Sequence, residues 1–149
     1  MLSRVGVAAR VNVNSKRQAL TTAAEIAARI TGQKADRLLA ALLEREQAGS
    51  TGVGGGVALP HAHVPGVERL TAVFLRLDEP VGFAAMDDRP VDLIFALFAP
   101  EGAGAEHLQA LAKVSRLLRQ AELREQLRQA QTADAIYALL VREPQSTAA

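Results

Sequence analysis

The 149-residue sequence contains no cysteine and no tryptophan, and its aromatic residues are limited to one tyrosine and four phenylalanines. The lack of cysteine excludes disulfide bonds, thiolate catalysis and cysteine metal sites. It also agrees with a reducing compartment. Chemistry that depends on sulfur is therefore absent from the functions to be considered.

Charge of one sign and long hydrophobic runs are also absent. The 17 basic and 16 acidic residues are mixed along the chain, with a formal net charge of +1, so no large field attracts a nucleic-acid backbone. The most apolar segment, Val91 to Phe98, carries Asp92 and is far shorter than the roughly 18 residues of a membrane span. The apolar runs near Met1 are too short for a signal peptide. We expect a cytoplasmic protein with no nucleic-acid partner and no membrane insertion.

The length and the hydrophobic content of 49% fit one compact domain. We place this domain at residues 15–142, after an N-terminal arm at 1–14 and before a tail at 143–149. Helical periodicity predicts helices near 16–30, 35–47, 122–130 and 133–141, and another after Gly104 with Leu108, Leu111 and Leu118 on one face. Runs of β-prone residues predict strands at 57–59, 70–77, 81–83 and 91–98, with turns expected at Asp78-Glu-Pro and Asp87-Asp-Arg-Pro. This order indicates an α/β fold whose sheet is covered by helices.

Basic residues recur in the last third of the chain, where they alternate with Glu122 and Glu125. Such mixed charge predicts a solvated helix surface. The basic residues concerned are Lys113, Arg116, Arg119, Arg124 and Arg128.

Two of the three histidines, His61 and His63, follow Pro60 at the end of a glycine-rich segment. A neutral imidazole is a nucleophile near pH 7, and a phosphoryl group on its nitrogen remains transferable. Proline restricts the backbone and can present the next side chain in a defined direction. Taken singly, however, each histidine is better explained as an ordinary surface or core residue.

Two other readings of this segment have less support. His61 and His63 could share one face of an extended segment and bind a metal, but only His107 and unspaced carboxylates are left to complete the ligands. A nucleotide-binding loop fails because Gly56 is followed by Val57-Ala58, where a Walker motif needs lysine and a hydroxyl residue. The dinucleotide motif fails too, since Val57 stands where glycine is required.

A long ordered set of motifs resembles the enzyme IIA domains of the fructose, mannitol and nitrogen-regulatory class of the bacterial phosphotransferase system. The motifs are Arg45-Glu-Gln-Ala-Gly-Ser-Thr-Gly-Val-Gly, Val57-Ala-Leu-Pro-His61, Glu79-Pro-Val-Gly-Phe, the run from Asp88 to Glu101, and the run from His107 to Arg119. The resemblance extends from about Ser15 to Leu140. It implies a mixed β-sheet flanked by helices on both sides.

The same resemblance implies the site residues. His61 corresponds to the phosphorylated histidine, and Arg45 and His107 correspond to residues that assist phosphoryl transfer. Phosphoryl transfer depends on positioning and on stabilising the charge of three oxygens, for which a guanidinium and an imidazole N–H are suitable. As ordinary structure, Arg45 would complement a helix dipole and His107 would be a partly buried helix residue.

A loop is expected to bind phosphate or the partner protein through its backbone N–H groups. Its residues are Ser50, Thr51, Gly52 and Gly54, together with His63. In this class the active histidine is commonly followed by glycine and then a basic or polar residue, whereas Ala62 and His63 follow it here. His63 can therefore replace a basic contact with the partner or the phosphate and introduce a pH dependence near neutrality.

Within the class, the short chain resembles the nitrogen-regulatory enzyme IIA (PtsN type) most. This implies a phosphohistidine carrier that accepts phosphate from an HPr- or NPr-like protein. It would regulate targets, such as a sensor kinase or a potassium transporter, by its phosphorylation state. Such a protein is a phosphotransferase component rather than a free-standing enzyme, and needs no metal or other cofactor. The alternatives are a sugar-specific IIA that passes phosphate to a IIB protein, and a binding module that is not phosphorylated.

Overall fold

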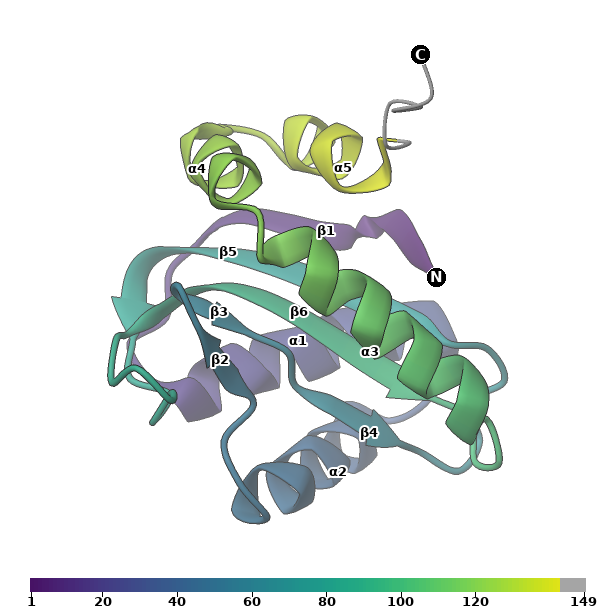
Figure 1. The fold of residues 1–149 in the computed structure, drawn as a ribbon. Helices are drawn as coiled ribbons and strands as arrows, with labels where there is room; N and C mark the ends of the chain where they lie inside the picture. Colours follow the sequence, from purple (N-terminus) through teal and green to yellow (C-terminus); the bar gives the residue numbers. More distant parts are fainter. Residues whose placement is uncertain (143–149) are drawn as a thin grey trace.

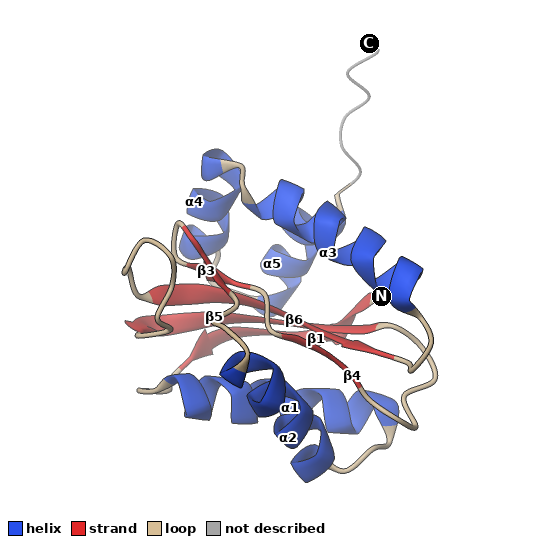
Figure 2. Cartoon of the chain, turned by 60° about the horizontal axis from the view of Figure 1, so that its bottom comes forward, coloured by secondary structure: helices blue, strands red, loops and turns tan. Residues whose placement is uncertain are grey.

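The computed structural model describes residues 1–142 and shows a mixed sheet between two layers of helices (Figures 1 and 2). The predicted tail at 143–149 lies outside the described residues. The elements in chain order are β1 (Leu2–Val11), α1 (Lys16–Thr31), α2 (Ala35–Gln47), β2 (Gly52–Gly54), β3 (Val57–Ala58), β4 (His61–His63), β5 (Thr71–Val81), β6 (Val91–Ala99), α3 (Gly104–Leu118), α4 (Ala121–Gln129) and α5 (Ala133–Val141).

The sheet has the strand order β1-β5-β6-β3-β2, and β4 also pairs with β6. β5 and β6 are antiparallel, whereas β1 runs parallel to β5, and β3 and β4 run parallel to β6. Residues 71–77 of β5 and most of β6 are buried, because helices cover both faces of these strands. The predicted α/β class and mixed sheet are therefore confirmed.

Helices α1 and α2 cover one face of the sheet, and α3, α4 and α5 cover the other (Figure 2). α1 begins where the Ser15 side chain accepts from the Gln18 backbone N–H, and it ends at Gly32 with φ of 76°. Its buried face consists largely of alanines, which allow close packing on the sheet. The second face packs Phe74 and Phe95 against residues of α3, α4 and α5.

The glycine-rich segment forms a short hairpin and then runs along β6. β2 pairs with β3 in antiparallel orientation, and Gly54, Gly55 and Gly56 have positive φ angles. After Pro60, β4 resumes the pairing, with His61 opposite Leu97. Pro60 cannot donate a hydrogen bond, but its carbonyl accepts one from the Leu97 N–H. This break places the two histidines of β4 at the edge of the sheet, beside α2.

Three local predictions were wrong. The segment 1–14 contains β1, whose exposed and irregularly paired residues gave no clear alternation. The expected turn at Asp78-Glu-Pro lies inside β5, which stays extended through an irregular register between Arg76 and Val81. The buried face of α3 is turned by about one residue, so His107, Val114 and Leu118 are buried and Leu108 is exposed.

Candidate functional site

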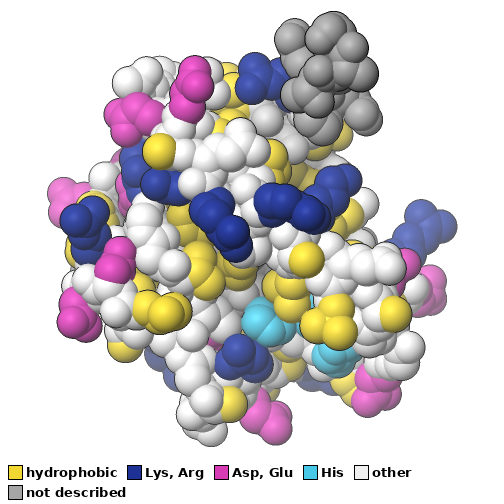
Figure 3. Space-filling view, viewed as in Figure 1, with side chains coloured by type: hydrophobic (Ala, Val, Ile, Leu, Met, Phe, Trp, Pro, Cys, Tyr) yellow, Lys and Arg dark blue, Asp and Glu magenta, His cyan; other side chains and the backbone are white. Residues whose placement is uncertain are grey.

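A pocket lies between α2, β4 and α3 and brings together three residues that are far apart in the sequence: Arg45, His61 and His107. His63 lies at the same pocket. Figure 3 shows histidine side chains reaching the surface of this face beside hydrophobic and basic side chains. The remaining lining residues are Ala41, Glu44, Ala48, Ala62, Gly104, Leu108 and Leu111.

His61 is half-buried, and its Nδ1 lies 2.7 Å from the Leu59 carbonyl oxygen. A carbonyl can only accept, so Nδ1 carries the proton, and in the neutral ring Nε2 holds the lone pair. Burial lowers the pKa of His61, the hydrogen bond to Leu59 opposes this effect, and the charge of Arg45 lowers the pKa further. The neutral tautomer with a nucleophilic Nε2 is therefore favoured.

His107 is 4% exposed and lies near the start of α3. Its ring is edge-on to His61 with a centroid distance of 5.2 Å, and its Nδ1 is 2.9 Å from His63 Nε2. Burial and the neighbouring charges of His61 and His63 lower the pKa of His107 to about 4. Within residues 1–142, its Nε2 is buried without a hydrogen-bond partner. The ring is thus neutral near pH 7 and retains one unused nitrogen.

Arg45 lies in the last turn of α2, and one of its terminal nitrogens donates to the Gly49 carbonyl at 2.8 Å. This agrees with the structural reading of a residue that complements the helix end. A guanidinium has five N–H groups, so this bond leaves donors available for an anion in the pocket. The position of Arg45 is therefore compatible with a structural role at the helix end and with binding of an anion in the pocket.

The loop residues Ser50, Thr51, Gly52 and Gly54 do not line the pocket. The Ser50 hydroxyl donates to the Phe83 carbonyl and accepts from the Gly52 N–H. A Cβ on Gly52 would lie 2.7 Å from that of Ala85, so this glycine is needed for packing. Gly54 lies near Asp87. The structure thus separates these residues from Arg45, His61 and His107.

Glu46 is a supporting residue that the sequence analysis missed. Its carboxylate is buried, pairs with Lys16 at 2.8 Å and accepts from the Thr51 N–H at 3.1 Å. These contacts attach the end of α2 to α1 and to the following loop. They thus hold in place the helix end that carries Arg45. The sequence does not indicate this pairing, because Lys16 lies at the start of one helix and Glu46 near the end of another.

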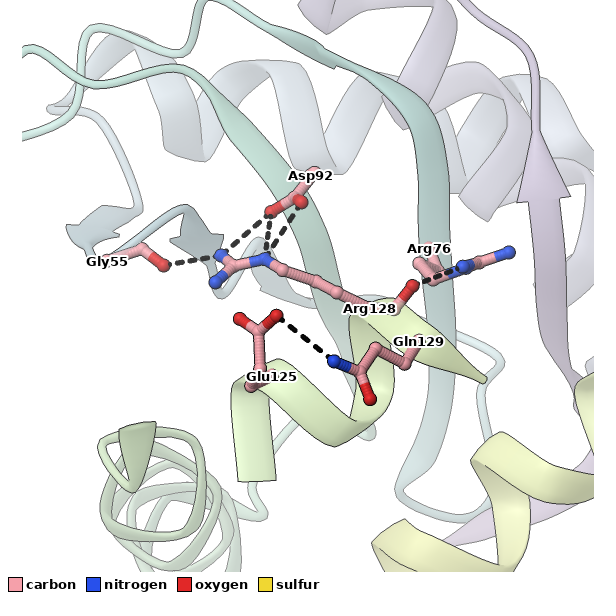
Figure 4. A network of polar contacts seen from close by, with 6 residues as sticks. All are labelled: Gly55, Arg76, Asp92, Glu125, Arg128 and Gln129. Carbon is pink, nitrogen blue, oxygen red and sulfur yellow. Dashed lines mark hydrogen bonds and ion pairs between the residues drawn. The ribbon is translucent and has the colours of Figure 1, made fainter. Parts of the chain in front are cut away.

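Arg128 forms a second polar network, beside the glycine hairpin (Figure 4). It binds Asp92 through Nε and a terminal nitrogen at 2.9–3.2 Å, and donates to the Gly55 carbonyl at 2.7 Å. We call Arg128, Asp92 and Gly55 the arginine clasp. Arg124 donates to the Leu118 and Arg119 carbonyls at the end of α3. The prediction of a solvated surface was therefore wrong for these two arginines.

The metal-binding alternative receives no geometric support in the described part of the chain. No group of three or more histidine, aspartate or glutamate side chains there is arranged to hold a metal ion. His63 and His107 instead turn ring nitrogens toward each other. Among residues 1–142, no helix is sufficiently long and apolar to cross a membrane.

The fold agrees with comparisons with known proteins. The family described as "Phosphoenolpyruvate-dependent sugar phosphotransferase system, EIIA 2" matches residues 1–143, and the chain belongs to this family. A nitrogen regulatory protein of Bradyrhizobium diazoefficiens is 49% identical over 138 residues, which cover 93% of this chain and 90% of that protein. The crystal structure of nitrogen regulatory protein IIA-Ntr from Neisseria meningitidis has a TM-score of 0.89 and 37% identity, covering 94% of this chain and 96% of that one.

A sugar-specific relative is also similar. The fructose-specific EIIA component of Haloferax volcanii is 41% identical over 105 residues, covering 70% of this chain and 68% of that protein. The chain is thus an EIIA type-2 protein that resembles nitrogen regulatory proteins over more of its length than it resembles this fructose component.

Proposed function

We propose that this protein is a cytoplasmic phosphohistidine carrier that accepts a phosphoryl group on Nε2 of His61 from an HPr- or NPr-like phosphocarrier. The observation that carries this proposal is the hydrogen bond from His61 Nδ1 to the Leu59 carbonyl. This bond fixes the tautomer whose Nε2 lone pair can attack phosphorus. The lowered pKa of His61 keeps the ring in its neutral form near pH 7.

In the transfer step, the Nε2 lone pair forms a bond to phosphorus while the bond between phosphorus and the donor breaks. The pair of electrons from the broken bond leaves with the donor. The His61 ring then carries a proton on Nδ1 and the phosphoryl group on Nε2, and the Leu59 carbonyl stabilises the resulting positive ring. No further reactant is needed.

Arg45 and His107 have supporting roles in this proposal. The guanidinium of Arg45 is the cationic group of the pocket and stabilises charge on the transferred oxygens. His107 supplies a buried ring whose Nε2 has no partner within residues 1–142, so it is available to one of these oxygens. Positioning and charge are what phosphoryl transfer requires from a protein.

The loop that contains Ser50, Thr51, Gly52 and Gly54 then contributes to contact with the donor protein through its exposed residue Val53, since Thr51 and Gly52 are buried. The exposed fraction of Val53, 47%, supports this role, since an apolar side chain in this loop is accessible to a partner. His63 of β4 lines the pocket and would contact the donor protein together with this loop.

Regulation of target proteins by phosphorylation state is the favoured outcome, supported by the similarity to proteins named as nitrogen regulators. A sensor kinase or a potassium transporter is the kind of target we expect. The second candidate, transfer to a IIB protein for sugar uptake, is supported by the fructose-specific relative. The two separate experimentally: a sugar-specific protein transfers its phosphate rapidly to a IIB partner, whereas a regulator retains its phosphate in the presence of a IIB protein.

The test is phosphate transfer from phosphoenolpyruvate through the general phosphotransferase enzyme and an HPr-like carrier, followed by intact mass. We expect a phosphate-sized gain in the natural protein and none in a folded His61→Ala variant. Gln131→Ala, at an exposed residue outside the pocket, is the control and should gain the phosphate as the natural protein does. No gain in the natural protein with cognate donors would contradict the proposal and favour a binding module that is not phosphorylated.

A further inference from the structure

His63 and His107 form a chain of hydrogen bonds that ends on a backbone carbonyl. His63 Nδ1 lies 3.2 Å from the Pro100 carbonyl oxygen, and His63 Nε2 lies 2.9 Å from His107 Nδ1. Because the carbonyl can only accept, His63 Nδ1 carries a proton in every state that keeps this bond. Only the proton of the hydrogen bond between His63 Nε2 and His107 Nδ1 can then belong to either ring.

When His63 is neutral, its Nε2 has a lone pair and accepts. His107 must then donate from Nδ1, which leaves the lone pair of a neutral His107 on Nε2. When His63 is protonated, its Nε2 donates instead, and His107 Nδ1 must accept. The single proton of His107 is then on Nε2. One proton added to His63 therefore converts His107 Nε2 from an acceptor to a donor, although His107 itself stays neutral.

We propose that His63 is a positioning residue that selects, through its own protonation, whether His107 Nε2 presents a lone pair or an N–H to the pocket. For its effect on phosphoryl transfer, the inference rests on the proposed function. An N–H on Nε2 stabilises a phosphoryl oxygen on His61, whereas a lone pair there repels it. Phosphorylation of His61 is thus coupled to the uptake of one proton from solvent by His63.

Burial supports this relay. His107 is 4% exposed, and its Nε2 is one of the buried polar atoms without a partner in the described chain. The lowered pKa of His107, about 4, keeps this ring neutral near pH 7. His63 is exposed to solvent, from which it can take up the proton directly. The relay requires one ring that exchanges protons with solvent and one that stays buried and neutral, and His63 and His107 fit these two requirements.

Other charges around the relay come from β4 and α2. His61 lies on the same strand as His63, and Glu44 and Arg45 of α2 line the same pocket. Arg45 disfavours a second positive charge there, and Glu44 favours it. Glu46 is paired with Lys16 and acts on His61 rather than on the relay. A dianionic phosphoryl group would outweigh these single charges and favour protonated His63.

The first experiment observes the ring nitrogens of the full-length, unphosphorylated protein, labelled with ¹⁵N-histidine, by NMR between pH 5 and 8.5. The sequence has only three histidines, so single substitutions assign every signal. We expect His107 to carry its proton on Nδ1 at high pH and on Nε2 once His63 is protonated. A His107 tautomer that does not change while His63 titrates would overturn the relay.

The second experiment uses His63→Lys, because an ammonium group only donates. We expect this variant to hold His107 as the Nε2–H tautomer at every pH. We also expect it to remove the pH dependence of the equilibrium constant for phosphorylation by the donor, which in the natural protein changes by up to about tenfold per pH unit for one linked proton. The control is Gln131→Lys, which adds the same charge at an exposed residue outside the pocket and should retain both the tautomer change and the pH dependence.

The outcomes separate the two proposals. A protein that accepts phosphate but shows no tautomer change overturns the relay and leaves the proposed function intact. A tautomer change in a protein that accepts no phosphate supports the relay and contradicts the proposed function. Loss of the pH dependence in the Gln131→Lys control as well as in His63→Lys would show that net charge, rather than the relay, produces it.

Discussion

Two polar clusters lie beside β6, and they satisfy their hydrogen-bonding groups very differently. In the arginine clasp, Arg128 makes a bidentate ion pair with Asp92 and also reaches the Gly55 carbonyl. In the pocket that holds the histidines, His107 Nε2 is buried with no partner within residues 1–142. Buried polar groups are normally paired, so an exception needs a reason. The clasp has the features of a structural contact, whereas the unpaired nitrogen of His107 agrees with the role proposed for it in phosphoryl transfer.

The two clusters also differ in charge, because the histidine rings are neutral whereas the clasp is an ion pair. Burial lowers the pKa of both His61 and His107, so these rings remain neutral near pH 7. Asp92 and Arg128 instead form a charged pair at 2.9 Å. A neutral imidazole is reactive, whereas a paired carboxylate is not. Disturbing the pocket should therefore change phosphorylation, and disturbing the clasp should change stability.

The largest effect is expected for Arg45→Ala. Loss of the cationic donor should slow phosphorylation of His61 by roughly 10²–10³-fold, the usual effect of removing a donor to developing charge. The free energy of unfolding should change by less than about 1 kcal/mol, because the bond to Gly49 is exposed. Rapid-quench phosphorylation kinetics and urea denaturation measure the two quantities. An unchanged rate would remove Arg45 from the transfer step and leave it as a helix-end residue.

The clasp should show the opposite pattern in Arg128→Ala. This change leaves the partly buried Asp92 without its partner, so we expect a loss of roughly 2–3 kcal/mol in the free energy of unfolding. The phosphorylation rate below the unfolding transition should change less than about threefold, since the clasp does not line the pocket. Gln129→Ala, at the exposed neighbouring residue, is the control and should cost less than about 0.5 kcal/mol. Equal losses in the two variants would contradict a structural role for the clasp.

The lowered pKa of His107 predicts a pH dependence of stability. The unfolded chain binds this proton near pH 6.5, whereas folded His107 binds it only near pH 4. Between these values the unfolded state holds more protons, so stability falls as pH falls, by up to about 1.4 kcal/mol per pH unit. Urea denaturation at pH 7 and pH 5 should show a smaller loss in His107→Gln than in the natural protein. Parallel losses would show that His107 is not the buried neutral group responsible.

The smallest effect concerns the rim of the pocket. Leu108 is 68% exposed and lines the pocket, so Leu108→Ser should weaken donor binding by about fivefold, equivalent to about 1 kcal/mol. The maximal phosphorylation rate should stay the same. Val141→Ser removes an exposed apolar side chain from α5, outside the pocket, and should have no effect on donor binding. Kinetics at varied donor concentration would detect the difference, and equal values for the two variants would remove Leu108 from the donor contact.

Much of the fold could be predicted because its signals are local. α2 spans the predicted residues 35–47, since its leucines repeat with helical spacing and Gly49 follows its end. β1 was missed because its pairing with β5 is irregular and several of its residues are exposed. The turn expected at Pro80 failed because an extended strand also tolerates proline where its pairing is interrupted.

The pocket, too, could be predicted only in part from the sequence. Arg45, His61 and His107 were identified through the motifs of the family, and the structure places them together. The hydrogen bond between His63 and His107 could not be predicted, because it depends on how α3 is turned against β4. The predicted face of α3 differed by about one residue, which would have placed His107 at the border of the buried face rather than within it. The arginine clasp could not be predicted either, because Arg128 lies in a sequence of alternating charge, which is typical of a solvated helix surface.

The most direct test of the account is NMR of the ¹⁵N-histidine-labelled protein after phosphorylation, reading which ring nitrogen is bonded to phosphorus. The hydrogen bond from Nδ1 to Leu59 predicts a phosphorus–nitrogen coupling at Nε2 of His61, with Nδ1 still protonated. A coupling at Nδ1 of His61, or at either nitrogen of His63 or His107, would contradict the proposed mechanism.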